Sequence, residues 1–214
     1  MTIIRLQSNV EAQAEVASLG FNSAYESFIA RLQALQKGKV VPRVGEAFPN
    51  LALPDASGRY RSILQIQDGR PLVISFNRGR WCPFCVHELQ SWAAASAALV
   101  EAGGTLIVVA GEIGEGASSI QDMIGPSATL LCDVDHGAAL ACGLAFPVGD
   151  DLKRRYLEIG IDLAAIYGSD GGFLPIPATF VVGEDGNIRY AHVDPDFRMR
   201  AEPMDVVEFV AAMR

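Results

Sequence analysis

The feature that most constrains the fold is a pair of cysteines between an apolar segment and a helical pattern. Residues 71–76 are apolar and rich in β-branched and aromatic side chains, which predicts a buried strand. Apolar residues then recur at helical spacing over 89–100, and a Gly-Gly pair ends that pattern. Cys82 and Cys85 therefore lie at the start of a helix that directly follows a buried strand.

The position of Cys82 in the first helical turn favours redox chemistry. Pro83 lies where a missing N–H costs nothing. The unpaired N–H groups and the positive end of the helix dipole stabilise a thiolate there, and the thiol pKa typically falls to roughly 3.5–7.5. We predict that Cys82 faces solvent, has a lowered pKa and attacks the substrate. Cys85, one turn further in, is predicted to be more buried and to close an internal disulfide.

Two other interpretations of the pair remain. A Cys-x-x-Cys pair can be half of a zinc site, but such a site needs two further ligands at matching spacing. Cys132 and Cys142 lie inside ordinary elements, where we interpret them as structural, and the three histidines are scattered. The pair could also consist of two core cysteines, because free cysteine is often buried. We expect neither a metal nor a cofactor.

Composition argues against several classes of function. The net charge of -8 disfavours nucleic acid or an anionic membrane as a partner. No apolar stretch approaches the length that spans a membrane, and the first residues show no secretion signal. Four cysteines in 214 residues do not make a disulfide scaffold. We expect a cytoplasmic protein with one main domain.

Residues 1–40 predict an N-terminal helical extension that packs on the main domain. Ser8 and Ser23 each have capping-box spacing to a glutamate three residues later, and a glycine closes each segment. The second segment places apolar side chains on one face, which we expect to be buried. These side chains are Phe21, Tyr25, Phe28, Leu32 and Leu35.

Residues 41–214 alternate between strand and helix patterns, which implies a parallel sheet core. The segment 146–174 interrupts this alternation. The turn at 184–186 predicts an antiparallel hairpin between the last two strands. The expected strands are 51–53, 71–76, 105–110, 128–132, 178–182 and 187–193. Beyond the helix after the cysteines, the expected helices are 116–124, 136–144, 150–159 and 202–213.

The order of these features resembles the thioredoxin fold, an α/β fold with a central mixed sheet flanked by helices. In that superfamily a cis proline faces the redox cysteines, and Pro177 occupies the matching place. A trans proline that opens an edge strand is the alternative. More narrowly, residues 45–214 resemble the alkyl hydroperoxide reductase/thiol-specific antioxidant (AhpC/TSA) family. The match is to a peroxiredoxin-like group with Arg-Gly-x-Trp-Cys-Pro-aromatic-Cys, the pattern that runs from Arg78 to Cys85.

The chain departs from the usual peroxiredoxin pattern, Pro-x-x-x-Thr-x-x-Cys followed later by an arginine. Counted back from Cys82, the threonine place is Gly79 and the proline place is Ser75. Pro177 stands where the later arginine is usually found. The set that polarises the peroxide is therefore missing in its usual form.

Peroxide attack needs a donor to the developing oxyanion, and Arg78 and Arg80 are the cations nearest in sequence. We predict that Arg78 supplies this charge as a catalytic residue, and that Arg80 contributes less. Trp81 is predicted to form a wall of the site, and the loop at Pro177 to position the partner. Arg80, Trp81 and Pro177 are therefore the predicted substrate-binding residues.

The resemblance implies a thiol peroxidase that reduces hydroperoxides and is re-reduced by a thiol of the thioredoxin or glutathione type. The Cys-Pro-Phe-Cys sequence and Pro177 also favour a thiol–disulfide oxidoreductase that acts on protein or glutathione disulfides. A redox-inert or sensing module is the third interpretation. Members of the family commonly form dimers, so we weigh a homodimer against a monomer whose extension caps its own domain.

Overall fold

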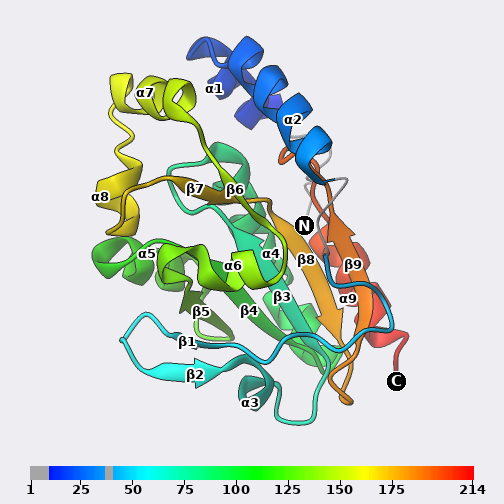
Figure 1. Ribbon diagram of the computed structural model, residues 1–214. Helices are drawn as coiled ribbons and strands as arrows, with labels where there is room; N and C mark the ends of the chain where they lie inside the picture. Colours follow the sequence, from blue (N-terminus) through cyan, green and yellow to red (C-terminus); the bar gives the residue numbers. More distant parts are fainter. Residues whose placement is uncertain (1–9, 37–40) are drawn as a thin grey trace.

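The computed structural model describes residues 10–36 and 41–214 and has a five-stranded sheet at its centre (Figure 1). The strand order is β5-β4-β3-β8-β9. The strands β5, β4 and β3 are parallel, whereas β8 is antiparallel to both β3 and β9. The predicted mixed sheet is confirmed, and its parallel part is limited to three strands. Their bounds are β3 (Leu72–Asn77), β4 (Thr105–Ala110), β5 (Ala128–Cys132), β8 (Ala178–Val182) and β9 (Ile188–Val193).

Hydrophobic clusters lie on both faces of this sheet. Successive side chains of a strand point to opposite faces, so Val73 packs in one cluster while Ile74 and Phe76 pack in the other. The cluster around Val73 contains Trp92, which is completely buried. It is closed by α4 (Pro83–Glu101), α5 (Gly114–Ile124) and α9 (Pro203–Ala211). The long helix expected after the cysteines is α4.

The other cluster is covered by shorter elements and by the N-terminal helices. The predicted hairpin of β1 and β2 is present, and Asp55 Oδ1 accepts the backbone N–H groups of Ser57 and Arg59 in its turn. The shorter elements are β1 (Ala52–Pro54), β2 (Tyr60–Ser62), α3 (Ile63–Gln67), the 3₁₀ turn η2 (Val134–His136), α6 (Gly137–Ala141), β6 (Ala145–Pro147), α7 (Asp150–Glu158), α8 (Leu163–Tyr167) and β7 (Phe173–Pro175).

Two helices, α1 (Val10–Ser18) and α2 (Asn22–Gln36), precede the main domain. Figure 1 places them over the end of the body that carries α7 and β7. Four of the five side chains predicted on the apolar face are buried. Leu35 is the exception at 44% exposure, because it lies in the last turn of α2 and outside the hydrophobic cluster. Ser8, predicted to cap the first helix, lies outside the described residues.

Two local expectations are wrong, and one strand pairing was not predicted. The helix predicted over 136–144 is shorter, because η2 and α6 end at Ala141 and β6 follows. Within the segment 146–174, β7 pairs with β6, a pairing that three-residue strands do not reveal by their pattern. The described residues contain no cis peptide bond, so the bond before Pro177 is trans, which was the alternative interpretation.

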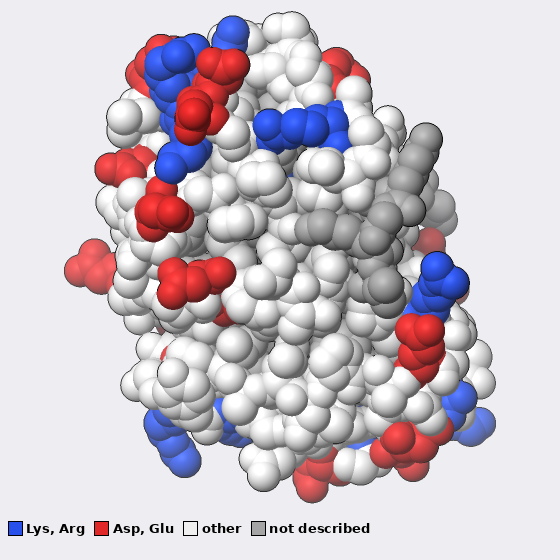
Figure 2. All heavy atoms as spheres, viewed as in Figure 1, with Lys and Arg blue, Asp and Glu red and all other residues white. Residues whose placement is uncertain are grey.

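The surface carries mixed charges. Figure 2 shows basic and acidic side chains side by side over α7, so this part of the visible face has no continuous patch of one sign. Among the described helices, none combines the length and the apolar character needed to cross a membrane.

Candidate active site around Cys82 and Cys85

The two cysteines lie where β3 passes into α4. Cys82 is the residue before the helix and has extended backbone (φ −101°, ψ 114°), while Cys85 lies in the first turn. Both thiols are free and buried, with 3% exposure for Cys82 and 0% for Cys85. The prediction that Cys82 faces solvent is therefore wrong. Cys82 shares its hydrophobic cluster with residues of α2, whose position local sequence patterns could not reveal.

Cys85, and not Cys82, receives the hydrogen bonds that stabilise a thiolate. Its Sγ accepts the backbone N–H of Arg78 at 3.4 Å and lies 3.5 Å from Nη2 of Arg200. Burial alone would raise the pKa of Cys85, but the hydrogen bond from Cys82 and the charge of Arg200 outweigh it. The pKa of Cys85 therefore lies well below its ordinary value.

The pKa of Cys82 shifts in the opposite direction. The hydrogen bond with Cys85 and burial raise the pKa of Cys82 well above its ordinary value. Arg78 and Arg200 lower it by a smaller amount. The prediction that the helix N-terminus lowers the Cys82 pKa is wrong, because Cys82 is the proton donor in this pair. The hydrogen bond from the Arg78 N–H and the nearby Arg200 guanidinium favour Cys85 as the thiolate of the pair.

Arg200 is the site residue that sequence reasoning missed. It is 4% exposed, its Nη1 pairs with the Glu88 carboxylate, and its Nε donates to the carbonyl of Phe197 at 2.7 Å. Glu88 also accepts hydrogen bonds from Ser75 Oγ at 3.0 Å and Asn77 Nδ2 at 3.4 Å. Burial raises the pKa of Glu88, and the Arg200 charge opposes that rise. These contacts hold the guanidinium rigidly beside Cys85.

Arg78 lies at the site, but among the described residues its guanidinium donates no hydrogen bond to either thiol. The guanidinium is 4.0 Å from the ring centroid of Phe197 and 5.6 Å from that of Phe28, and its Nε donates to the carbonyl of Pro175 at 3.1 Å. Its backbone N–H is the group that reaches Cys85. Arg78 therefore contributes a donor from the main chain and a more distant charge.

Arg80 is held away from the thiols by Glu112. Its Nε donates to Glu112 Oε2 at 3.1 Å, and its backbone N–H donates to Oε1 of the same carboxylate. Gly79 has a φ of +113°, and a Cβ there would lie 2.2 Å from Glu112 Oε1. Glycine at position 79 thus allows the buried carboxylate to contact the loop. Arg80 and Glu112 together anchor the loop that precedes Cys82.

Trp81 packs beside the pair and joins the same loop to α8. Its Nε1 contacts the carbonyl of Arg78 at 3.0 Å and the hydroxyl of Tyr167 at 2.9 Å, and Tyr167 itself donates to that carbonyl at 2.8 Å. The Trp81 ring meets Tyr156 edge-on at 5.1 Å. Pro177 is buried directly before β8, and the nearby carbonyl that contacts the site belongs to Pro175.

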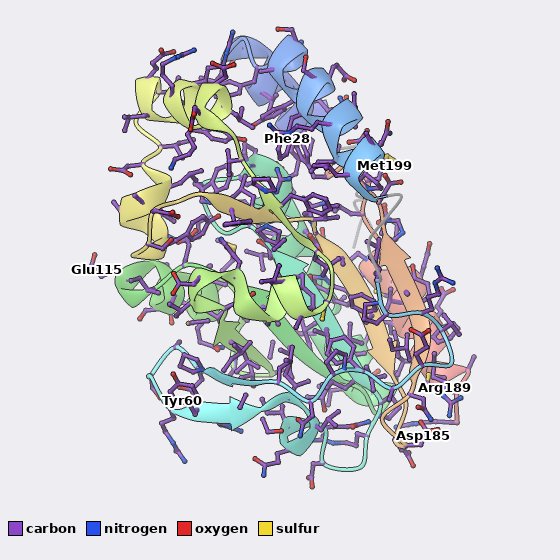
Figure 3. The ribbon with its side chains drawn as sticks, in the orientation of Figure 1. Phe28, Tyr60, Glu115, Asp185, Arg189 and Met199 are labelled. Atoms are coloured by element: carbon purple, nitrogen blue, oxygen red, sulfur yellow. The ribbon has the colours of Figure 1, made fainter. Side chains whose placement is uncertain are left out.

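Helix α2 supplies an aromatic cover to the pair. Figure 3 shows Phe28 beneath this helix, toward the body. Tyr25 is 7% exposed, meets Phe197 edge-on at 4.9 Å, and accepts a hydrogen bond from the hydroxyl of Tyr156 at 3.2 Å. Burial and the nearby charge of Cys82 raise the pKa of Tyr25 to about 12.

Cys132 and Cys142 differ from the cysteine pair, because the groups around them only raise their pKa. Burial raises the pKa of Cys132 to about 11 and that of Cys142 to about 12, so both stay protonated at neutral pH. Both are buried, in agreement with a structural role. Among residues 10–36 and 41–214, no group of three or more histidine, cysteine or acidic side chains could hold a metal ion.

Comparison with known proteins places most of this chain in a described family. The pattern of the AhpC/TSA family matches residues 44–191. A comparison with curated protein sequences gives no significant match. Peroxidoxin BcpB from Mycobacterium tuberculosis superposes with a TM-score of 0.62 at 16% identity, covering 81% of this chain and 99% of that one.

Two further solved structures share the fold. Peroxiredoxin Q from Xanthomonas campestris gives a TM-score of 0.58 at 18% identity, covering 81% of this chain and 97% of that one. Reduced Prx3 from Vibrio vulnificus, solved in complex with hydrogen peroxide, gives a TM-score of 0.61 at 15% identity. The superposition covers 78% of this chain and 98% of that one. The superpositions cover these three neighbouring chains almost completely. In this chain, by contrast, the family match begins only after α1 and α2.

Proposed function

The chain belongs to the AhpC/TSA family of peroxidase-type thiol oxidoreductases, and we propose that it reduces hydroperoxides through a dithiol–disulfide cycle of Cys85 and Cys82. The observation that carries this proposal is the contact between Cys85 Sγ and the Arg200 guanidinium. A fixed cation beside a buried thiolate both activates the nucleophile and can stabilise an oxygen that leaves with negative charge.

The steps use groups of the described site. The Cys85 thiolate attacks one peroxide oxygen, so that an S–O bond forms and the O–O bond breaks. The leaving alkoxide, or hydroxide, takes the proton of the Cys82 thiol and departs as an alcohol or water. The resulting Cys82 thiolate attacks the sulfur of the Cys85 sulfenic acid, an S–S bond forms, and hydroxide leaves to be protonated by solvent. An external thiol of the thioredoxin or glutathione type then supplies two electrons to restore both thiols.

This assignment exchanges the roles expected from the sequence. The electrostatics of the pair favour it, because the pKa of Cys85 is lowered and that of Cys82 is raised. Counted back from Cys85, the threonine place of the family pattern Pro-x-x-x-Thr-x-x-Cys is Cys82, whose thiol can donate a hydrogen bond, and the proline place is Arg78. In this proposal Arg200 has the role of the later arginine that the sequence pattern lacks.

A thiol–disulfide oxidoreductase is the second candidate, favoured by the hydrogen bond between the two thiols, which places them ready to form a disulfide. Two measurements distinguish these functions. Reduced protein is mixed with hydrogen peroxide in a stopped-flow instrument to follow thiol loss, and it is mixed separately with insulin to follow reduction of the insulin disulfides. We expect rapid thiol loss with peroxide and slow reduction of insulin. Slow thiol loss with fast insulin reduction would replace the peroxidase proposal by the second candidate.

The remaining expectations stay part of the proposal. We retain residues 1–40 as an extension of a domain that spans 41–214, and a cytoplasmic location. We also retain the choice between a homodimer and a monomer. Phe21, Tyr25 and Phe28 are buried within their own chain, which supports the monomer whose extension caps its own domain. Light scattering over a range of concentrations decides between the two.

A further inference from the structure

We propose that α2 sets the oxidant specificity of the reduced protein: it admits small hydroperoxides to the cysteine pair and excludes the disulfide bonds of other proteins. This inference rests on the proposed function and names its substrate class. Its starting observation is that Cys82 is only 3% exposed and Cys85 is completely buried. Attack on a disulfide bond requires the thiolate to approach one of its two sulfurs along the bond, so access limits which disulfides can react.

The cover over the pair is made of aromatic side chains from α2 and from the segment after β9. Phe28 and Phe197 both lie against the Arg78 guanidinium, at 5.6 Å and 4.0 Å from their ring centroids. Tyr25 packs edge-on against Phe197. Phe84, which lies between the two cysteines in sequence, also packs edge-on against Phe197, with 6.0 Å between the ring centroids. The attacking thiolate is that of Cys85, which is completely buried, so we expect that a folded protein cannot bring its disulfide to Cys85 without displacing these rings.

Polar contacts hold α2 in place over the site. Glu26 pairs with Arg198 at 2.7 Å, and Arg198 is oriented by a second ion pair with Asp196, also at 2.7 Å. Arg31 donates to the carbonyls of Pro147, at 2.8 Å, and Val148. These contacts connect α2 to two different segments of the main domain.

A hollow offers small molecules a way toward this cover. It measures about 560 Å³ and lies between α1, α2 and the start of α4, where its lining includes Tyr25, Phe84 and Arg198. This volume is in the range of small-molecule sites and far below that of a protein domain. Because the family match begins at residue 44, α2 and the two rings that it contributes, Tyr25 and Phe28, lie outside the matched segment.

The test compares a small oxidant with a protein disulfide in matched variants. Phe28→Ala removes part of the cover, Glu26→Ala loosens α2 without changing a buried side chain, and Leu35→Ala changes an exposed position of the same helix as the control. For each reduced protein we measure the rate constants with hydrogen peroxide and with insulin, and circular dichroism verifies folding.

We expect the ratio of the insulin rate to the peroxide rate to rise at least about tenfold in Phe28→Ala and severalfold in Glu26→Ala, because local opening exposes the thiols. Leu35→Ala should leave the ratio unchanged. An unchanged ratio in folded Phe28→Ala and Glu26→Ala would overturn the proposal, and Glu26→Ala alone decides if Phe28→Ala does not fold. Loss of peroxide reaction in every protein would refute the proposed function instead, and the insulin rates would then still report whether α2 excludes protein disulfides.

Discussion

The Nη2 atom of Arg200 lies 3.5 Å from Sγ of Cys85, although the two residues are 115 positions apart in the sequence. This contact joins the segment after β9 to the first turn of α4. The Glu88 carboxylate, one turn further along α4, holds the same guanidinium. The guanidinium that contacts Cys85 therefore comes from a distant segment of the chain, whereas the guanidinium of Arg78 acts on the pair only as a charge without a hydrogen bond to it.

Replacing Arg200 is expected to slow the peroxide reaction by roughly two to three orders of magnitude, because removal of such a donor typically costs about 2.7–4 kcal/mol of transition-state stabilisation. The pH dependence should also move. The wild-type Cys85 thiolate is lost as the pH falls through its lowered pKa. In Arg200→Met this loss should occur at higher pH. Stopped-flow rates from pH 5 to pH 9 provide the measurement, and Arg189→Ala, at an exposed ion pair, is the control. A superimposable profile for Arg200→Met would contradict this prediction.

The buried pair of Arg200 and Glu88 should also matter for stability. Arg200→Met leaves the Glu88 carboxylate buried without its cation, which we expect to lower the free energy of unfolding by about 3–5 kcal/mol. The double variant with Glu88→Gln should recover part of this loss, because no uncompensated charge remains. Urea unfolding of the single and double variants gives the values. Equal losses in both would mean that the charge of Glu88 is not the cause.

Arg78→Ala is expected to slow the peroxide reaction less than Arg200→Met does. Its guanidinium donates to Pro175, and the backbone N–H that contacts Cys85 survives the substitution. Arg80→Ala should have a smaller effect still, because its side chain pairs with Glu112. Rate constants for the three variants under identical conditions establish the order. A larger loss in Arg78→Ala than in Arg200→Met would restore the role that the sequence assigned to Arg78.

Glu112→Ala should raise the pKa of Cys85 and slow the reaction by about ten- to a hundredfold, because the loop that carries the Arg78 N–H loses its anchor. Glu112→Gln retains an oxygen acceptor for the Arg80 N–H and should recover most of the rate. Ultraviolet titration of the thiolate reports the pKa without any substrate. Identical titration curves for wild type and Glu112→Ala would show that Glu112 does not position the loop.

Much of the fold follows from local patterns in the sequence. The strands β4, β5 and β8 have the bounds that their apolar runs predict, and the turn at 184–186 joins β8 to β9 as expected. The short pairing of β6 with β7 was missed, because strands of three residues carry too little periodicity to be recognised.

The place of the cysteine pair in the fold was predicted correctly, but the electrostatics around the pair were not. Cys82 and Cys85 lie at the start of α4 as predicted. The proton distribution between them depends on Arg200 and on burial by α2, both of which come from distant segments. A buried arginine after the last strand carries no local signature of its role. Its position within the part of the chain that resembles the family was the one available signal.

The most direct test of this account is the site of the first oxidation. Cys82→Ser and Cys85→Ser proteins are reduced, treated with one equivalent of hydrogen peroxide and trapped with dimedone, and the adduct is located by mass spectrometry. The account predicts a sulfenic acid adduct on Cys85 in Cys82→Ser and no rapid oxidation of Cys85→Ser. Rapid formation of an adduct on Cys82 in Cys85→Ser, with Cys82→Ser inert, would contradict it.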